Sequence, residues 1–383
     1  VCAAERRFIP PGWEEASWTD STAKRPKGRE AGKKSEGDDL LRSMRRARAK
    51  LRRLALSNSF AYFVTLTLDK DVTVPAGANV AFENATLTVG SGTTLTLDGE
   101  FYVHPNCHLI VEEGGTLVNN VNLTITNHAS HENGAVVTVN GELVSNGGIW
   151  ISDGGELNVN GTAVVYRELH AGFGGNGLLC PVNVSGDLTV YAYTNIVPGT
   201  GELNIAEGGA VTVGGNLCDE EGNPWTNGFL QAGGNVNVYG TLNLDGGFTL
   251  GCEDGTSELN VYEGGTVNVP QDNMWCDITE TGLVSNEGTV TNDGIINVYG
   301  TISNYAQFIN NGQVRLFGTG TYDDYNDTSI GGNEPVDGAQ ALLDAFLNDL
   351  EDGQGANLYD TVTLAEDLTI DLGETREISE IGI

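Results

Sequence analysis

Basic residues are scarce over most of this chain. After residue 60, the sequence of 383 residues contains only four Lys and Arg residues, which are Lys70, Arg167, Arg315 and Arg376. Enzymes that eliminate across an acidic polysaccharide need a Lys or Arg as the base and another to hold the substrate carboxylate. No two of these four residues lie close together in the sequence, so the pattern disfavours that chemistry. The acidic surroundings would also repel DNA and anionic membranes.

Other signals are absent as well. No run approaches 18 apolar residues, so we expect no membrane-spanning helix. Residues 2–10 contain no apolar segment of the kind that a secretory signal needs. The six Cys residues include no C-x-x-C pair, which favours small buried side chains over a disulfide framework and leaves the cellular compartment open. We expect that both ends of the chain are truncated.

The charge is divided unevenly along the chain. The first 60 residues hold fifteen of the 19 Lys and Arg residues but only eight of the 52 Asp and Glu residues. Such asymmetry indicates two unrelated pieces. We therefore divide the chain into a disordered basic segment (1–37), a basic helix plus strand (38–63), a repetitive segment (64–330), and a helix followed by the start of a further repeat (331–383).

The repetitive segment is best represented by Glu258–Pro270, which reads ELNVYEGGTVNVP. Two short strands, each with an Asn between two apolar residues, are joined by a Gly-Gly turn. Strands this short are stable only when they stack coil upon coil, with the apolar residues inside and the Asn or Thr outside. Similar short sequence motifs recur at separations that are multiples of 20 residues. The pattern predicts an all-β fold, a parallel β-helix of about 20 residues per coil.

Residues 64–330 resemble the Gly-, Asn- and Thr-rich β-helices of bacterial surface proteins, including adhesins and autotransporter passengers, and share the broad architecture of pectin lyases. The resemblance implies a non-catalytic scaffold at the cell surface or outside the cell. We expect glycans or other surface proteins as its partners. A polysaccharide lyase or hydrolase on the same fold is the alternative.

A second resemblance lies before the repeats. Residues 10–69, with PPGW at their start and the strand FVTLTL near their end, resemble the N-terminal part of phage and plasmid rolling-circle replication initiation proteins. The resemblance implies nucleic-acid binding by the basic run Arg45, Arg46, Arg48, Lys50, Arg52 and Arg53. That family also needs two His residues spaced two apart and a nucleophilic Tyr beside a Lys. This chain has neither arrangement, so replication activity is not expected, and a solvated helix face is the alternative for the basic run.

Function on a solenoid is expected where insertions interrupt the repeats. Three predicted insertions, Tyr166–Pro181, Cys218–Gly234 and Gln271–Thr281, carry the candidate ligand-binding residues Arg167, Glu168, His170, Trp225, Asp272 and Trp275. Exposed Trp beside Asp would suit contact with a sugar ring, whereas Trp packed over the apolar wall is the alternative.

Two further features of the acidic segment are candidates for specific roles. Asp323, Asp324 and Asp327 could bind Ca²⁺ through oxygen ligands, and no other cofactor is expected. Gly338–Asp352 has a helical apolar stripe, which predicts a helix that covers one end or side of the solenoid.

Overall fold

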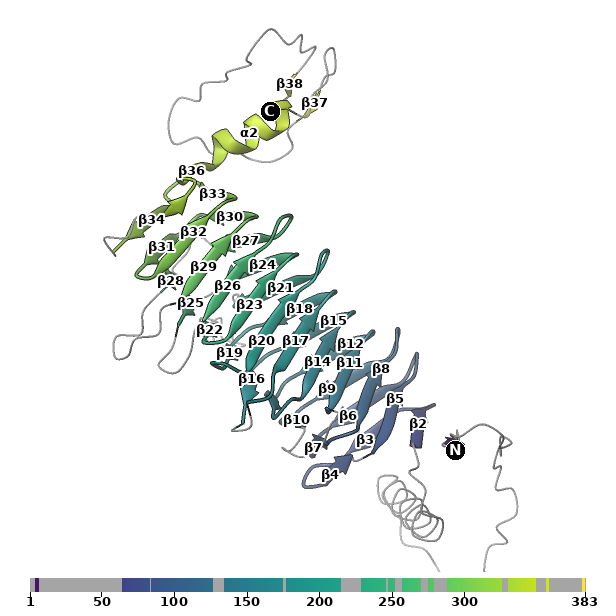
Figure 1. Cartoon of the computed structure of the whole chain (residues 1–383). Coiled ribbons are helices and arrows are strands. Elements are labelled where there is room, and N and C mark those ends of the chain that lie inside the picture. The colour runs from purple at the N-terminus through teal and green to yellow at the C-terminus, as the bar shows by residue number, and fades with distance from the viewer. Residues whose placement is uncertain are drawn as a thin grey trace, which may run out of the picture. The chain divides into compact units, whose positions relative to one another are not determined.

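The structure is a computed structural model (Figure 1). It describes residues 4–6, 64–82, 84–126, 134–174, 177–214, 229–245, 247–251, 257–269, 275–278, 288–325, 330–348, 356–357 and 381–382. The predicted basic helix before residue 64 lies outside these ranges. The chain forms two compact units: unit 1 comprises residues 1–167 and 173–180, and unit 2 comprises residues 168–172 and 181–383.

Each coil contributes one strand to each of three parallel sheets, which we name A, B and C in chain order. The coil that starts at Glu258 illustrates the rule: β26 (Glu258–Val261) belongs to sheet A, β27 (Thr266–Val269) to sheet B and β28 (Trp275–Ile278) to sheet C. Leu259 and Val261 are buried, whereas Asn260 between them is only half-buried. This alternation confirms the predicted parallel β-helix.

Unit 1 contains the first coils. Its sheet A strands are β2 (Val64–Leu68), β5 (Ala85–Val89), β8 (His108–Val111), β11 (Val136–Val139) and β14 (Glu156–Val159), with β1 (Ala4–Arg6) antiparallel to β2. Its sheet B strands are β3 (Val72–Val74), β6 (Thr94–Leu97), β9 (Thr116–Asn119), β12 (Glu142–Ser145) and β15 (Thr162–Val165). Its sheet C strands are β4 (Asn79–Phe82), β7 (Glu100–Val103), β10 (Leu123–Thr126) and β13 (Ile149–Ser152).

Unit 2 continues the same pattern. Its sheet A strands are β20 (Gly201–Ile205), β23 (Asn235–Val238), β26, β29 (Thr289–Asn292), β32 (Gln307–Asn310) and β35 (Gly331–Gly332). Its sheet B strands are β18 (Asp187–Val190), β21 (Ala210–Gly214), β24 (Thr241–Asp245), β27, β30 (Ile295–Val298), β33 (Gln313–Leu316) and β36 (Val336–Asp337). Its sheet C strands are β19 (Tyr193–Ile196), β22 (Phe229–Ala232), β25 (Gly247–Leu250), β28, β31 (Thr301–Asn304) and β34 (Thr321–Asp324).

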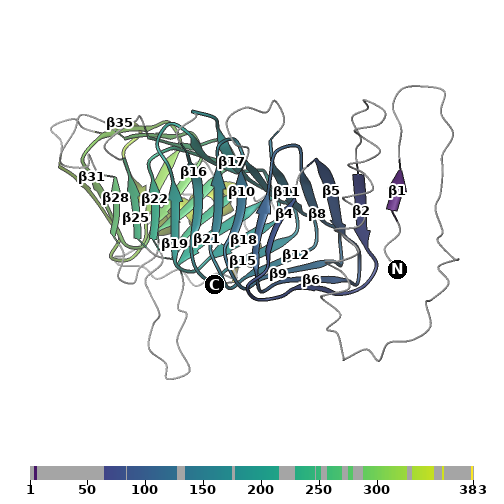
Figure 2. The same ribbon diagram turned by 90° about the horizontal axis from the view of Figure 1, so that it is seen from below.

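Two strands have residues in both units: β16 (Leu169–Phe173) belongs to sheet C and β17 (Cys180–Val184) to sheet A. A final short pair, β37 (Ala356–Asn357) with β38 (Ile381–Gly382), is parallel. Figure 2 shows the sheet C strands of unit 2, β19 to β31, side by side.

Asparagine ladders tie neighbouring coils together on the outside. On sheet A, the amide of Asn237 donates to Asn204 at 2.9 Å, and that of Asn260 donates to Asn237 at 3.2 Å. The sequence separations across such bonds give the coil lengths, which are 20 residues for Asn160 to Asn140 and 33 for Asn237 to Asn204. Asn311 and Asp293 are only 18 residues apart, so the predicted coil of about 20 residues lies near the short end of the range, and insertions lengthen other coils.

The interior contains a second set of amides, which the sequence pattern does not indicate. Asn119, Asn292, Asn304 and Asn310 are all 0 % exposed. Asn292 donates to the side-chain oxygen of Asn310 at 2.7 Å and to the carbonyl oxygen of Gln313 at 3.1 Å. These buried amides replace apolar residues at strand ends, where the chain turns and its carbonyls need donors.

Helix α2 (Gly338–Asn348) follows the last strands of unit 2, within the range predicted for a helix. It lies against β33 and β36, and Ala339 and Leu343 on it are buried. Gly338 starts the helix directly against the ring of Phe317, where a Cβ atom would approach ring atoms to 2.7 Å. The contact with β33 agrees with the expectation that the helix covers part of the solenoid. No helix in the described ranges is long and apolar enough to cross a membrane.

Candidate functional site

The long connections of unit 2 adjoin one sheet. Residues 215–228 and 270–274 lead into sheet C, and residues 251–257, 279–288 and 325–330 lead out of it. The connections from sheet A to sheet B between described strands are never longer than those at 206–209 and 262–265. Insertions that gather along one face of a repeat protein mark the face that varies, which is commonly the binding face.

Each of the three predicted insertions includes a regular sheet C strand, so the insertions are shorter than expected. The segment Tyr166–Pro181 contains β16, Cys218–Gly234 contains β22, and Gln271–Thr281 contains β28. Of the candidate residues in these segments, His170 and Trp275 lie on sheet C strands.

Strand register places alternate residues of the sheet C strands in two columns across unit 2. The first column is Tyr193, Phe229, Gly247, Trp275, Thr301 and Thr321. The second column is His170, Asn195, Gln231, Thr249, Asp277, Ser303 and Asp323. The first column starts with large aromatic residues, and the second consists of polar residues throughout. Neighbouring positions in a column are about 4.8 Å apart, which is the spacing of strands in a sheet.

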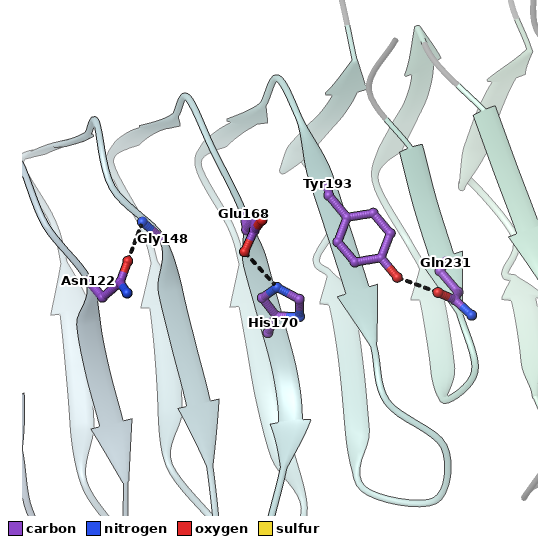
Figure 3. A network of polar contacts seen from close by, with 6 residues as sticks. All are labelled: Asn122, Gly148, Glu168, His170, Tyr193 and Gln231. Carbon is purple, nitrogen blue, oxygen red and sulfur yellow. Dashed lines mark hydrogen bonds and ion pairs between the residues drawn. The ribbon is translucent and has the colours of Figure 1, made fainter. Parts of the chain in front are cut away.

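Side-chain contacts connect the start of the two columns, as Figure 3 shows. Glu168, which is half exposed, lies with its Oε2 atom 3.2 Å from Nε2 of the buried His170. The rings of His170 and Tyr193 have their centroids 5.5 Å apart. The Tyr193 hydroxyl donates to Oε1 of Gln231, and burial, together with the charge of Glu168, raises the pKa of that hydroxyl. The contacts therefore run from Glu168 across three coils to Gln231 and fix these side chains in place.

This network differs from the sequence-based expectation in one respect. His170 was expected in an exposed insertion, but it lies within β16 and is only 6 % exposed. Its ring supports Tyr193 and pairs with Glu168, so Glu168 and Tyr193 present the accessible polar atoms. Arg167 is exposed and belongs to unit 1.

Several candidate residues lie outside the described ranges, and their roles stay predictions. These are Trp225, Asp272, Asp327 and the basic run Arg45, Arg46, Arg48, Lys50, Arg52 and Arg53. The backbone of Trp275 is described in β28, in the first column.

Asp323 and Asp324, the described members of the expected calcium site, are exposed on β34. The amide of Asn304 donates to Asp324 at 3.3 Å. Within the described part of the chain, no three His, Cys, Asp or Glu residues are grouped so that they could hold a metal ion. The predicted Ca²⁺ site stays a prediction, because Asp327 lies outside the described residues.

Exposed aromatic pairs at the coil corners were not anticipated from the sequence. Tyr239 stacks on Tyr262 with ring centroids 4.0 Å apart and planes 4° apart, and Tyr305 stacks on Tyr325 at 4.6 Å and 8°. In each pair, a ring on one coil stacks on a ring of a neighbouring coil, just as the Asn residues of the ladders bond one another from coil to coil on the sheets. Their spacing identifies them as corner ladders that stabilise adjacent coils.

The fold defines this chain as a parallel β-helix protein. No family model and no curated protein matches the sequence. Among solved structures, the chain is similar to the crystal structure of a TibC-catalysed hyper-glycosylated TibA55-350 fragment. The identity is 15 %, the match covers 70 % of this chain and 94 % of that one, and the TM-score is 0.21. The resemblance of residues 10–69 to replication initiation proteins stays a prediction.

Proposed function

We propose that this chain is a non-catalytic, adhesin-like surface scaffold that contacts glycans through the outward face of sheet C in unit 2. The observation that carries the proposal is the pair of columns on that sheet, one aromatic at its start and one polar throughout. Aromatic rings suit the apolar face of a sugar, and amide and hydroxyl groups can bond its hydroxyls. The long connections on both sides of sheet C would add contacts specific to one glycan.

The charge of the surface narrows the ligand class for this face. The two columns contain the acidic residues Asp277 and Asp323, with Glu168 beside them, and neither column contains Lys or Arg. An acidic face repels polyanions, whereas a neutral or amino sugar polymer meets no such barrier. We therefore expect neutral glycans on sheet C.

The non-catalytic assignment is supported by the neighbours of Glu168. Glycoside hydrolysis usually requires two carboxyl groups about 5 to 10 Å apart. The residues on the next coil in the two columns are Tyr193 and Asn195, which carry no carboxylate. The Glu168–His170 pair is the observation that favours a hydrolase instead, so activity must be measured.

A glycan array probed with the full chain, together with a reducing-sugar assay on every glycan that binds, tests the proposal. We expect binding without release of reducing ends. Turnover that the substitution Glu168→Gln abolishes would replace the scaffold proposal with a hydrolase. Absence of binding to any neutral glycan would refute glycan contact through sheet C.

A further inference from the structure

A single basic residue stands out in unit 2. Arg315 on β33 is the only Lys or Arg among the residues of unit 2 that the structure describes. It lies on the outward side of sheet B, yet it is only 9 % exposed. A desolvated guanidinium ordinarily pairs with a carboxylate, because burying an unpaired charge is unfavourable.

Arg315 has no such carboxylate partner among the described residues. Its Nε donates at 2.8 Å to the side-chain oxygen of Gln313, a neutral group two positions earlier on the same strand. Burial lowers the pKa of the guanidinium below its ordinary value, and the only opposing influence is the nearby Tyr299. The remaining donors of the guanidinium fork are therefore available to an anion.

The position also interrupts an asparagine ladder, which argues against a purely structural role. On sheet B, Asn268 donates to Asn243 at 2.8 Å and Asn297 donates to Asn268 at 2.9 Å. Register places Arg315 next in this column, directly beside Asn297. The Oδ1 atom of Asn297 is buried and accepts no hydrogen bond from the described residues. An Asn at 315 could continue the ladder by donating to this atom, whereas the Arg present does not.

Arg315 lines a shallow cavity of about 420 Å³ that is largely open to solvent. The cavity extends over successive corners between sheets A and B, and its polar side chains besides Arg315 are those of Asp293, Asn311, Gln313 and Asn333. Asn311 donates to Asp293 at 2.9 Å, and Asn333 donates to the carbonyl oxygens of Asn311 and Gly312 at 2.8 and 3.0 Å. These bonds hold the polar lining in a fixed arrangement before any ligand arrives.

We propose that this cavity, here called the Arg315 pocket, binds a sugar acid whose carboxylate pairs with the Arg315 guanidinium. The planar fork of Arg matches a carboxylate through two parallel hydrogen bonds. The volume lies in the range of small-molecule sites and exceeds what a carboxylate alone would fill. The Asp293 carboxylate and the amides of Asn311 and Gln313 are suited to sugar hydroxyls.

The Arg315 pocket lies at the corners between sheets A and B, so it is separate from the sheet C face. It adds a second recognition site to the proposed scaffold, with a different ligand charge. Glycan binding by sheet C and sugar-acid binding by the Arg315 pocket can be refuted independently, because the substitutions that test them share no residue.

Calorimetric titration of the full chain with D-glucuronate, D-galacturonate and N-acetylneuraminate tests the pocket, with D-glucose, acetate and L-glutamate as comparison ligands. We expect at least one sugar acid to bind at least about tenfold more tightly than D-glucose, through the charge-assisted pair. Arg315→Asn should remove that preference, and Arg315→Lys should retain only part of it, since an ammonium cannot form the two parallel bonds.

The Arg315→Asn variant is also a control for folding, because Asn can bond Oδ1 of Asn297 and continue the ladder. Its melting temperature should equal or exceed that of the unmodified chain. Equal affinity for glucuronate and glucose, or unchanged sugar-acid binding by Arg315→Asn, would overturn the proposal. Acetate or L-glutamate binding as tightly as the best sugar acid would overturn the assignment of the ligand class.

Discussion

The buried amide of Asn292 should hold the last coils of unit 2 together. Substitution by Ala removes its bonds to Asn310 and to the carbonyl oxygen of Gln313. Both acceptors lose a donor in a place where Asn292 and Asn310 are 0 % exposed. An unsatisfied buried polar group costs about 1–3 kcal/mol, so we expect Asn292→Ala to lose roughly 2–5 kcal/mol of stability.

The neighbouring exposed amide provides a matched control. Asn311 donates to Asp293 at 2.9 Å on the same pair of coils, but both side chains are exposed to solvent. Water can replace this bond, so Asn311→Ala should cost less than about 1 kcal/mol. The two substitutions remove the same chemical group, and they differ mainly in burial.

Hydrogen exchange resolved by segment is the appropriate assay, because a repeat protein can open locally rather than all at once. Asn292→Ala should speed exchange in β29, β32 and β33, whereas β20 and β23 should be unaffected. Urea unfolding followed by circular dichroism gives the total loss. Equal effects of Asn292→Ala and Asn311→Ala in both assays would refute the reasoning from burial.

Three further predictions concern other parts of the chain. In unit 1, a Cβ atom at Gly147 would lie 1.6 Å from the carbonyl oxygen of Val121, so Gly147→Ala should lower stability by about 2 kcal/mol or more in thermal unfolding. Burial lowers the pKa of His108 below 6.5, so the folded state favours its neutral form, and stability should fall as the pH decreases below about 6.5. His108→Asn should flatten that dependence in urea titrations at a series of pH values. Tyr262→Leu, which removes the stack on Tyr239, should cost about 0.5–1.5 kcal/mol in urea unfolding, and no measurable loss would contradict a corner ladder.

Much of the fold could be predicted from the sequence, because each strand carries its own signal. The segment Glu258–Val261 alternates polar and apolar residues, and a parallel stack of coils is the arrangement that buries its two apolar residues. The outward position of Asn260 and its bond to Asn237 follow from the same alternation. At this strand the local sequence pattern and the tertiary contacts agree, so the pattern was sufficient to predict the fold.

The buried amides could not be predicted in the same way. Asn292 and Asn260 are the same residue type near similar strands, yet one faces the interior and the other faces outward. Alternation along the strand puts Asn292 on the same side as the buried Val290, whereas Asn260 lies between the buried Leu259 and Val261. The inward positions were expected to be apolar, so an Asn at one of them was not expected. Sequence-based prediction therefore found the outer ladders and missed the inner amides.

The candidate site was located only in part. Glu168 and Trp275 were identified from the composition of predicted insertions, but the position of Glu168 just before β16 and of Trp275 on β28, both strands of sheet C, follows from the pairing of coils far apart in the sequence. Arg315 was noticed only as an isolated basic residue. Its importance comes from burial, from the missing carboxylate partner and from its place after Asn297 in a ladder, and all three require the three-dimensional structure.

The central claim is that sheet C of unit 2 is the binding face, and three matched substitutions test it directly. Thr249→Arg, Thr289→Arg and Thr241→Arg each place the same bulky cation at a half-buried Thr, on sheets C, A and B respectively. With a neutral glycan identified on the array, Thr249→Arg should weaken binding at least about tenfold, whereas the other two should stay within about twofold. Equal binding by all three variants, or a selective loss in Thr289→Arg or Thr241→Arg, would contradict the claim.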